Sequence, residues 1–308
     1  MNTNSSTDRA AARIVAKGKG SRAGDAWPFL AGCALLGTIG VFLHEANADP
    51  LTATWFRCAF GLLGMSAWVI LRRQTRCLLL TRGGAPWVLS ASMLMVLSWA
   101  LFFGAAERIS AGVAIVLFHV QPMWMLIFAS LWLKEAIGGQ RVVAVSVAMC
   151  GLVLATGIVE HTANGALQPG YWMGVAACLA GSLCMACVTI IAKRLREMPA
   201  GILAWWQCAV GTMVLSLWPM QHGWPAWGMS WAWLAGLGLI HTGFAYTLMY
   251  IGMARLDTAR IAVFQFVYPA VAIVTDWLVL DQRLSGVQMA GIVLMSVAVW
   301  FAERGRQG

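Results

Sequence analysis

Charged residues are scarce in this 308-residue chain. Asp and Glu number 12 and Lys and Arg 21, which together make 11% of the sequence. Soluble proteins contain about 25% charged residues, and so few cannot cover a chain that is 60% hydrophobic. An ordinary water-soluble globular protein is therefore excluded. The formal charge of +9 indicates anionic lipid headgroups rather than nucleic acid, because the basic residues flank apolar segments.

Several catalytic signatures are also missing. The chain has no Gly-x-x-x-x-Gly-Lys-Ser/Thr loop, which argues against an ATP-driven pump. His44-Glu45 lacks the second histidine of a zinc protease, and the pair Cys184 and Cys187 has no second cysteine pair. Most of the eight cysteines lie in apolar runs, where a thiol packs as a small hydrophobe. We expect no metal and no cofactor.

Long apolar runs dominate what is present. Each run has about 20 residues, enough for a helix to cross a ~30 Å hydrocarbon core. The ten runs lie near residues 27–44, 51–71, 85–105, 109–132, 138–158, 170–191, 201–219, 229–253, 258–280 and 285–302. The loops between them are too short for a water-soluble domain. The sequence predicts an all-α integral membrane protein with ten transmembrane helices, preceded by a basic tail over residues 1–26.

The distribution of basic residues predicts the orientation. With the N-terminus inside, all Lys and Arg residues fall on cytoplasmic segments except Arg57, Arg108 and Arg283. Basic residues resist translocation, so this asymmetry supports ten spans with both termini cytoplasmic, in a bacterial inner membrane. A cleaved signal peptide is the alternative for the first run, which precedes Ala46-Asn47-Ala48. Cleavage would leave nine spans.

The two halves of the chain resemble each other. A shift of 147 residues places Pro122 on Pro269, Trp99 on Tyr246 and Gln121 on Tyr268. We interpret residues 27–158 and 170–302 as two copies of a five-helix unit. Because five is odd, the copies would cross the membrane in opposite directions, as inverted repeats. Such repeats favour alternating access, in which a central site opens to each side in turn.

Three motifs carry a family resemblance. They are Thr54-Trp55-Phe56-Arg57, the segment from Ala106 to Gly112, and Pro122 followed by Leu131-Trp132-Leu133-Lys134-Glu135. In this order, and doubled along the chain, they resemble the EamA-type transporters of the drug/metabolite transporter superfamily. The second copy departs from the pattern, with Gln282 at the acidic position and Asp281 one residue early. The resemblance implies ten helices around a central cavity and transport, usually outward, of small organic metabolites.

Two prolines mark the predicted cavity. Pro122 and Pro269 should bend their helices near mid-membrane, each freeing the carbonyl four residues earlier. Such a carbonyl is tolerated only against protein or a watery cavity, although a single membrane proline is often merely packed. The polar and aromatic residues on the same helix faces, or equivalent by the repeat, form the predicted substrate cavity: Trp99, Phe118, Gln121, Tyr246, Tyr250, Gln265 and Tyr268.

Three ionisable residues within spans remain. His119 and Asp276 are candidates for proton coupling, since ionisable groups in membranes are usually functional. On an ideal helix His119 and Gln121 lie about 200° apart, so only one should face the cavity, and the repeat favours Gln121. A neutral histidine bonded between helices is the simpler interpretation of His119. For Arg57 we favour a structural or gating contact with Glu45 or Asp49, reached by extending outward, over the alternative of substrate binding.

The sequence thus predicts a secondary transporter that exports small organic metabolites such as amino acids or amphipathic amines. The partners expected are a small-molecule substrate and the lipid bilayer, without nucleic acid; the oligomeric state stays open. The alternative is a membrane-embedded hydrolase resembling intramembrane serine proteases, with Ser66 in Gly64-Met65-Ser66 as nucleophile and His119 or His241 as base. A regulatory or scaffolding membrane protein is a third reading, but it would not need the paired polar groups.

Overall fold

A computed structural model describes residues 25–106, 108–109, 111–135, 137–156, 170–279 and 284–304. Every regular element in these ranges is a helix. In chain order they are α2 (Trp27–Gly37), α3 (Ile39–Ala46), α4 (Pro50–Leu71), the 3₁₀-helix η2 (Thr75–Leu78), α5 (Ala85–Ala106), α6 (Ala111–Phe118), α7 (Gln121–Trp132), α8 (Gly139–Ala155), α10 (Tyr171–Arg194), α11 (Ala200–Leu215), α12 (Leu217–His222), α13 (Met229–Gly236), the π-helix η4 (Leu237–Phe244), α14 (Ala245–Met253), α15 (Thr258–Phe264), α16 (Val267–Val279) and α17 (Gly286–Arg304).

Eight of the helical segments in the described ranges are long and apolar enough to cross a membrane, judged by length and composition. Some combine two or three elements, for example α2 with α3 over Trp27–Ala46 and α13, η4 and α14 over Met229–Met253. Two further apolar helices, Gly139–Ala155 and Gly286–Ala302, are shorter. The all-helical membrane architecture predicted from the apolar runs is therefore confirmed, and the fifth and tenth runs correspond to the shorter helices.

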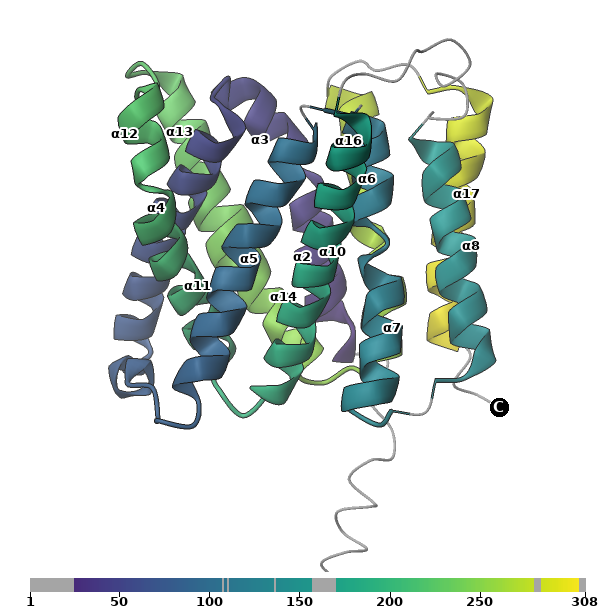
Figure 1. Cartoon of the computed structure of the whole chain (residues 1–308), viewed down its shortest axis with the longest axis horizontal. Coiled ribbons are helices and arrows are strands. Elements are labelled where there is room, and N and C mark those ends of the chain that lie inside the picture. The colour runs from purple at the N-terminus through teal and green to yellow at the C-terminus, as the bar shows by residue number, and fades with distance from the viewer. Residues whose placement is uncertain are drawn as a thin grey trace, which may run out of the picture.

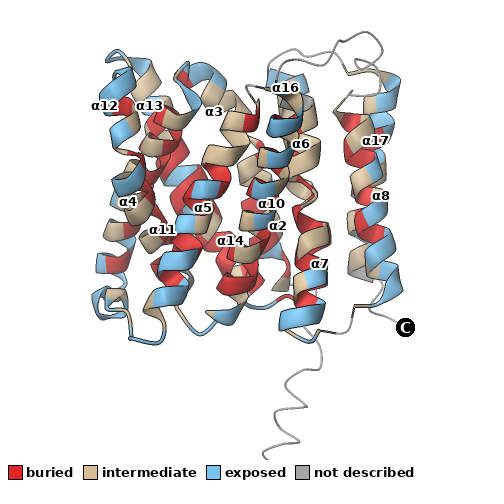
Figure 2. Ribbon diagram, viewed as in Figure 1, coloured by how far each residue is buried: buried red, intermediate tan, exposed pale blue. Residues whose placement is uncertain are grey.

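The helices stand side by side in a bundle (Figure 1). Buried residues lie mainly on the faces that helices turn toward one another (Figure 2). Large apolar side chains nevertheless remain exposed on the periphery, including Leu71 at 80%, Met213 at 81% and Trp172 at 71%. A water-soluble protein rarely exposes so much contiguous apolar surface. Lipid chains are the solvent that fits this outer face.

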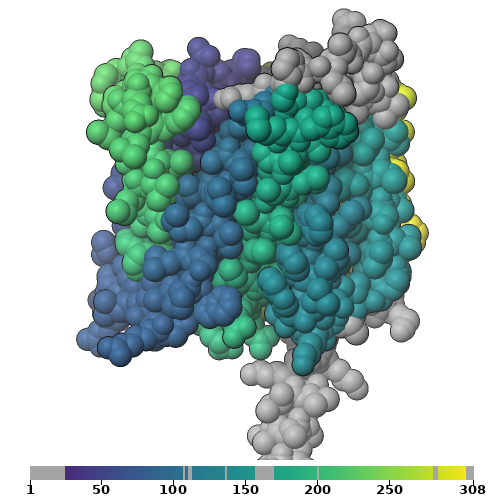
Figure 3. All heavy atoms as spheres, viewed as in Figure 1, coloured from purple at the N-terminus to yellow at the C-terminus, as the bar shows by residue number. Residues whose placement is uncertain are grey.

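Helix pairs distant in sequence form the bundle. The most extensive contacts join α5 to α10, α8 to α17, α4 to α11, α4 to η4, and α2 to α14. Side chains of α5, α10 and α7 fill the spaces between their ribbons on the face shown in Figure 3. Glycine permits the closest approach. A Cβ on Gly151 would lie 2.8 Å from the Gly291 carbonyl oxygen, so α8 and α17 touch backbone to backbone.

Short polar residues begin and end several helices. The Asp49 carboxylate accepts a hydrogen bond from the Thr52 amide at 2.9 Å and caps the start of α4. Asp257 caps α15 in the same way through the Arg260 amide. Asn47, with φ of 45°, ends α3 in the left-handed conformation that asparagine tolerates. These caps define the points at which the chain turns back into the membrane.

Candidate functional site

Two of the membrane-crossing segments are interrupted at mid-length. Between α6 and α7 the helix is broken at His119 and Val120, just before Pro122. Between α15 and α16 it is broken at Gln265 and Phe266, just before Pro269. Proline lacks the amide that would continue the helical hydrogen bonds at these points. The Gln265 carbonyl accepts instead from the Tyr268 amide at 3.2 Å, a tighter turn than an α-helix makes.

A cavity of about 210 Å³ lies between these breaks and α2, α3, α4, α5, α10 and α14. The structure brings all seven residues of the predicted substrate cavity to its wall. They are Trp99, Phe118, Gln121, Tyr246, Tyr250, Gln265 and Tyr268. A few polar groups on a largely apolar, aromatic wall are typical of small-molecule sites.

Arg57 occupies a different place from the predicted one. Its side chain is 6% exposed and borders the cavity instead of extending outward. Nε donates to Thr242 Oγ1 at 3.3 Å, and the guanidinium lies 5.2 Å from the Trp99 ring centroid. The expected contact with Glu45 or Asp49 is therefore wrong. Asp49 is used by the α4 cap and by the Trp218 indole.

His119 and Gln121 also differ from expectation, because both line the cavity. The predicted separation of about 200° assumed an unbroken helix, and the break at His119 removes that constraint. His119 Nδ1 lies 2.8 Å from the Ile115 carbonyl oxygen, which can only accept, so this nitrogen carries the proton. The ring stacks on Tyr268, with centroids 5.8 Å apart.

Asp276, the second candidate for proton coupling, does not line this cavity. It packs against α3, where a Cβ on Gly40 would lie 3.1 Å from Asp276 Oδ1. Asp276 lies eight residues beyond Tyr268 on α16, which is about 12 Å along the helix axis at 1.5 Å per residue. This distance places it beyond the end of the cavity wall.

Other polar residues at the site were missed by the sequence analysis. Thr189 accepts a hydrogen bond from Gln121 Nε2 at 3.4 Å, and Tyr250 donates to Gln207 Oε1. Thr242 lies on η4 and accepts a hydrogen bond from Arg57 Nε. Each is an isolated polar residue in an apolar run, which is the signal that could have found them.

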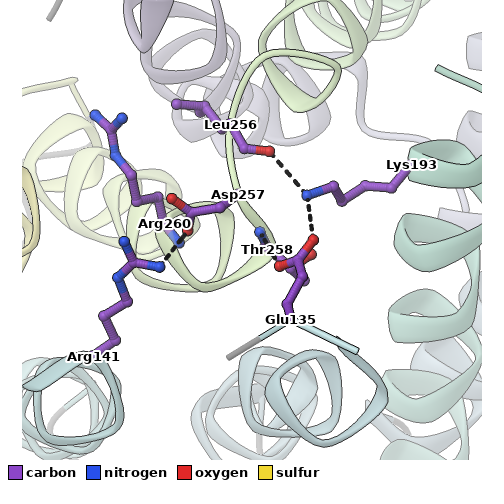
Figure 4. A network of polar contacts seen from close by, with 7 residues as sticks. All are labelled: Glu135, Arg141, Lys193, Leu256, Asp257, Thr258 and Arg260. Atoms are coloured by element: carbon purple, nitrogen blue, oxygen red, sulfur yellow. Dashed lines mark hydrogen bonds and ion pairs between the residues drawn. The ribbon is translucent and has the colours of Figure 1, made fainter. Parts of the chain in front are cut away.

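A network of charged groups joins the ends of α7 and α10, which line the cavity, to the start of α15 (Figure 4). Glu135 lies just after α7. Its Oε1 accepts a hydrogen bond from Lys193 Nζ of α10, and its Oε2 accepts one from the Thr258 amide of α15, both at 3.0 Å. Lys193 Nζ also donates to the Leu256 carbonyl at 2.9 Å. The same end of the bundle holds the start of α2 and the end of α17 (Figure 1). The network thus ties α7, α10 and the start of α15 together.

The environment of Glu135 favours its ionised form. Burial by itself raises the pKa of Glu135, but the Lys193 ammonium and the hydrogen bonds from Thr258 outweigh burial, so the pKa lies below its usual 4.5. The Glu135–Lys193 pair is largely shielded, with side chains 29% and 11% exposed. A second pair, Arg141 to Asp257 at 2.8 Å, is more open, with both side chains 37% exposed. The Glu135–Lys193 ion pair therefore stabilises the helix ends more than the Arg141–Asp257 pair does.

Ser66, the nucleophile of the alternative hydrolase, accepts a hydrogen bond from the Trp205 indole at 2.9 Å. His241 lies against Thr38, with Nε2 2.8 Å from Oγ1, and His119 against Ile115. Ser66 is thus paired with tryptophan and not with either suggested base. Asp281, Gln282 and Arg283, where the second half departs from the family pattern, lie outside the described residues.

The chain is similar in sequence to proteins named as transporters and similar in fold to a solved structure. A protein named as an uncharacterized transporter, YxxF, of Bacillus subtilis (strain 168) is 24% identical over 277 residues, covering 89% of this chain and 88% of the relative. A protein of Escherichia coli (strain K12) named a "probable amino-acid metabolite efflux pump" is 24% identical over 217 residues, 65% of this chain and 70% of its own. Among solved structures, a crystal structure covers 92% of this chain and 97% of its own with a TM-score of 0.81 at 18% identity, which supports the fold.

The sequence model of one family matches the chain twice. It is the EamA-like transporter family, and the matched residues are 23–157 and 172–303. The two matches cover nearly all the helices and include the broken segments and the cavity wall. The chain belongs to the EamA-like transporter family.

Proposed function

We propose that this protein is a secondary transporter that exports small organic metabolites, such as amino acids or amphipathic amines, by alternating access. The observation that carries the proposal is the aromatic cavity between two proline-broken helices, with a charged network that connects the helix ends on one side. Release of that network would let the cavity open toward that side. The name of the Escherichia coli relative supports a metabolite as substrate.

We extend the proposal to ten membrane helices arranged as two inverted repeats. The two separate matches to one family model support a duplication at residues 27–158 and 170–302. Reciprocal packing supports it too: α5 of the first half packs on α10 of the second, and α14 of the second packs on α2 of the first. Both termini would then lie in the cytoplasm of a bacterial inner membrane, with the charged network on that side.

Export from cells tests the transport function. We expect a screen for metabolite export and resistance to toxic analogues to find compounds handled by the wild-type protein. Tyr246→Ala and Gln265→Ala should reduce their export about tenfold, since losing one good contact is worth roughly 1.4 kcal/mol. Tyr171→Ala and Gln140→Ala, outside the cavity, are the matched controls. Full activity of both cavity variants on every transported compound would contradict the proposal.

Proton coupling is a separate part of the proposal. His119 on the cavity wall and Asp276 beside α3 are the candidates for carrying the proton. If neither residue couples transport to protons, transport proceeds by exchange or by facilitated movement. In proteoliposomes, the double variant His119→Gln, Asp276→Asn should lose the pH dependence of transport measured for the wild type. Retention of the full pH dependence would remove both residues from this role.

The hydrolase alternative finds little support in the contacts of Ser66, which is bonded to Trp205. A catalytic serine needs a base within hydrogen-bonding distance. A serine-directed activity probe that labelled Ser66 would nevertheless favour the hydrolase over the transporter.

A further inference from the structure

The cavity contains a buried positive charge. Arg57 lies in the interior of α4, is 6% exposed and borders the cavity. Its Nε–H is bonded to Thr242, and one face of the guanidinium lies over Trp99. The bond to Thr242 engages one of the five N–H donors of the guanidinium. The Tyr246 hydroxyl is also hydrogen-bonded to Arg57. The Nη–H donors, which form the fork that matches a carboxylate, outnumber these two partners.

No carboxylate lies among the residues that line this cavity in the described part of the chain. Asp276 packs on Gly40, outside the cavity wall. Asp49 is held by the Thr52 amide and the Trp218 indole, and Glu45 lies beside His44. A guanidinium in an apolar surrounding is costly without an anion beside it. The cavity is therefore electrostatically complementary to a negatively charged ligand.

The rest of the wall suits an aromatic body. Trp99, Phe118, Tyr246 and Tyr268 present rings from four different helical segments. The cavity measures about 210 Å³, whereas an apolar cavity of about 150 Å³ accepts benzene. The space fits one aromatic ring with a short side chain. A cation of the same size would meet the Arg57 charge at close range, where repulsion is poorly screened.

We infer that the cavity selects single-ring aromatic carboxylates and that Arg57 is the group that binds their carboxylate. This inference rests on the proposed transport function, and it narrows the substrate class to anions. Amphipathic amines, which the aromatic residues alone would favour, are disfavoured by the guanidinium. Arg57 thus determines specificity and is more than a structural contact.

Three probes of similar shape and different charge test the inference: phenylacetate, its neutral amide phenylacetamide, and benzylamine. Calorimetric titration of the full chain in lipid nanodiscs at neutral pH gives their dissociation constants. We expect phenylacetate to bind at least about tenfold more tightly than the other two. In Arg57→Gln the preference for phenylacetate over phenylacetamide should disappear, whereas Arg57→Lys, which keeps the charge, should retain part of it.

Arg108→Gln is the matched control, because Arg108 bonds the Gly104 carbonyl at the end of α5 and lies outside the cavity wall. It should leave the preference unchanged. Benzylamine or phenylacetamide binding as tightly as phenylacetate would overturn the inference, as would an unchanged preference in Arg57→Gln. If Arg57→Gln does not fold, as judged by size-exclusion chromatography, the wild-type ranking and Arg57→Lys decide.

The outcome is separable from that of the transport proposal. Tight, Arg57-dependent binding of phenylacetate without export of any compound would support the anion site and contradict transport. Export of other compounds together with a preference for benzylamine would support transport and overturn the anion site.

Discussion

Replacing Glu135 by glutamine is expected to open the cavity toward the end of the bundle where α7 and α10 end. The variant removes the charge that holds Lys193 but keeps an oxygen for the Thr258 amide. Losing a charged hydrogen bond in a shielded site costs about 2 kcal/mol, which shifts a closed-to-open equilibrium about 30-fold. Cys33, which lines the cavity, reports the change. In a background where Cys33 is the only cysteine, its labelling by a water-soluble maleimide from that side should accelerate by about this factor.

Glu197→Gln is the matched control. Glu197 is a carboxylate near the same end of α10, and its side chain is 94% exposed next to Arg196. Its removal should leave the labelling rate unchanged, because exposed ion pairs contribute little. Equal labelling rates in Glu135→Gln and wild type would show that the network does not hold the cavity closed.

Acidification should weaken the same Glu135–Lys193 ion pair. The Glu135 pKa is lowered in the folded protein, so the stabilisation by Lys193 is complete above the usual carboxylate pKa and is lost as pH falls through the lowered value. Maleimide reacts with the thiolate, so the labelling rates of Glu135→Gln and wild type are compared at the same pH, which cancels the pH dependence of the thiol itself. The ratio of the two rates should stay constant from neutral pH down to about pH 5 and fall toward 1 only under stronger acid, where Glu135 of the wild type is protonated.

Replacing Pro122 by alanine is expected to stabilise the protein and impair transport at once. Alanine restores an amide that can bond the Phe118 carbonyl, so α6 and α7 can join into one helix. Proline in a helix interior costs about 3 kcal/mol relative to alanine, and the joined helix should raise the thermal unfolding temperature. In a continuous helix His119 and Gln121 point in different directions, so one leaves the cavity. Transport should fall about tenfold, equivalent to roughly 1.4 kcal/mol.

Pro86→Ala controls for the substitution itself. Pro86 lies in the first turn of α5, where a missing amide breaks no helical hydrogen bond. Unfolding temperature and transport should both stay near wild type in this variant. Wild-type transport by Pro122→Ala would mean that the broken helix is dispensable.

Much of the architecture could be predicted because its determinants are local. A run of about 20 apolar residues predicts a membrane helix without knowledge of its neighbours. The cavity residues could be predicted from proline positions and from the likeness of the two halves, and Trp99 and Tyr246 do lie on one wall. Both inferences depend on composition and spacing, which the sequence contains.

The errors have physical causes that spacing does not contain. The long side chain of Arg57 can reach outward or inward from the same backbone, and the choice depends on Thr242 and Trp99, which come from distant segments. The angle between His119 and Gln121 was calculated for a helix that the proline interrupts. The Glu135 network joins helix ends and loops from three separate regions of the chain, and no local pattern predicts which of them meet.

The length of the π-helix η4 determines the direction in which the following tyrosine side chains point. Residues Leu237–Phe244 form wide turns directly before Tyr246 and Tyr250. Each residue of an α-helix advances the direction of its side chain by about 100°, so one residue more or fewer in η4 would rotate both phenol rings by over a quarter turn. Segment length, and not only the identity of the wall residues, therefore determines which ring meets the guanidinium. An insertion or deletion in η4 would therefore change the ligand specificity of the cavity although every residue of its wall is still present in the sequence.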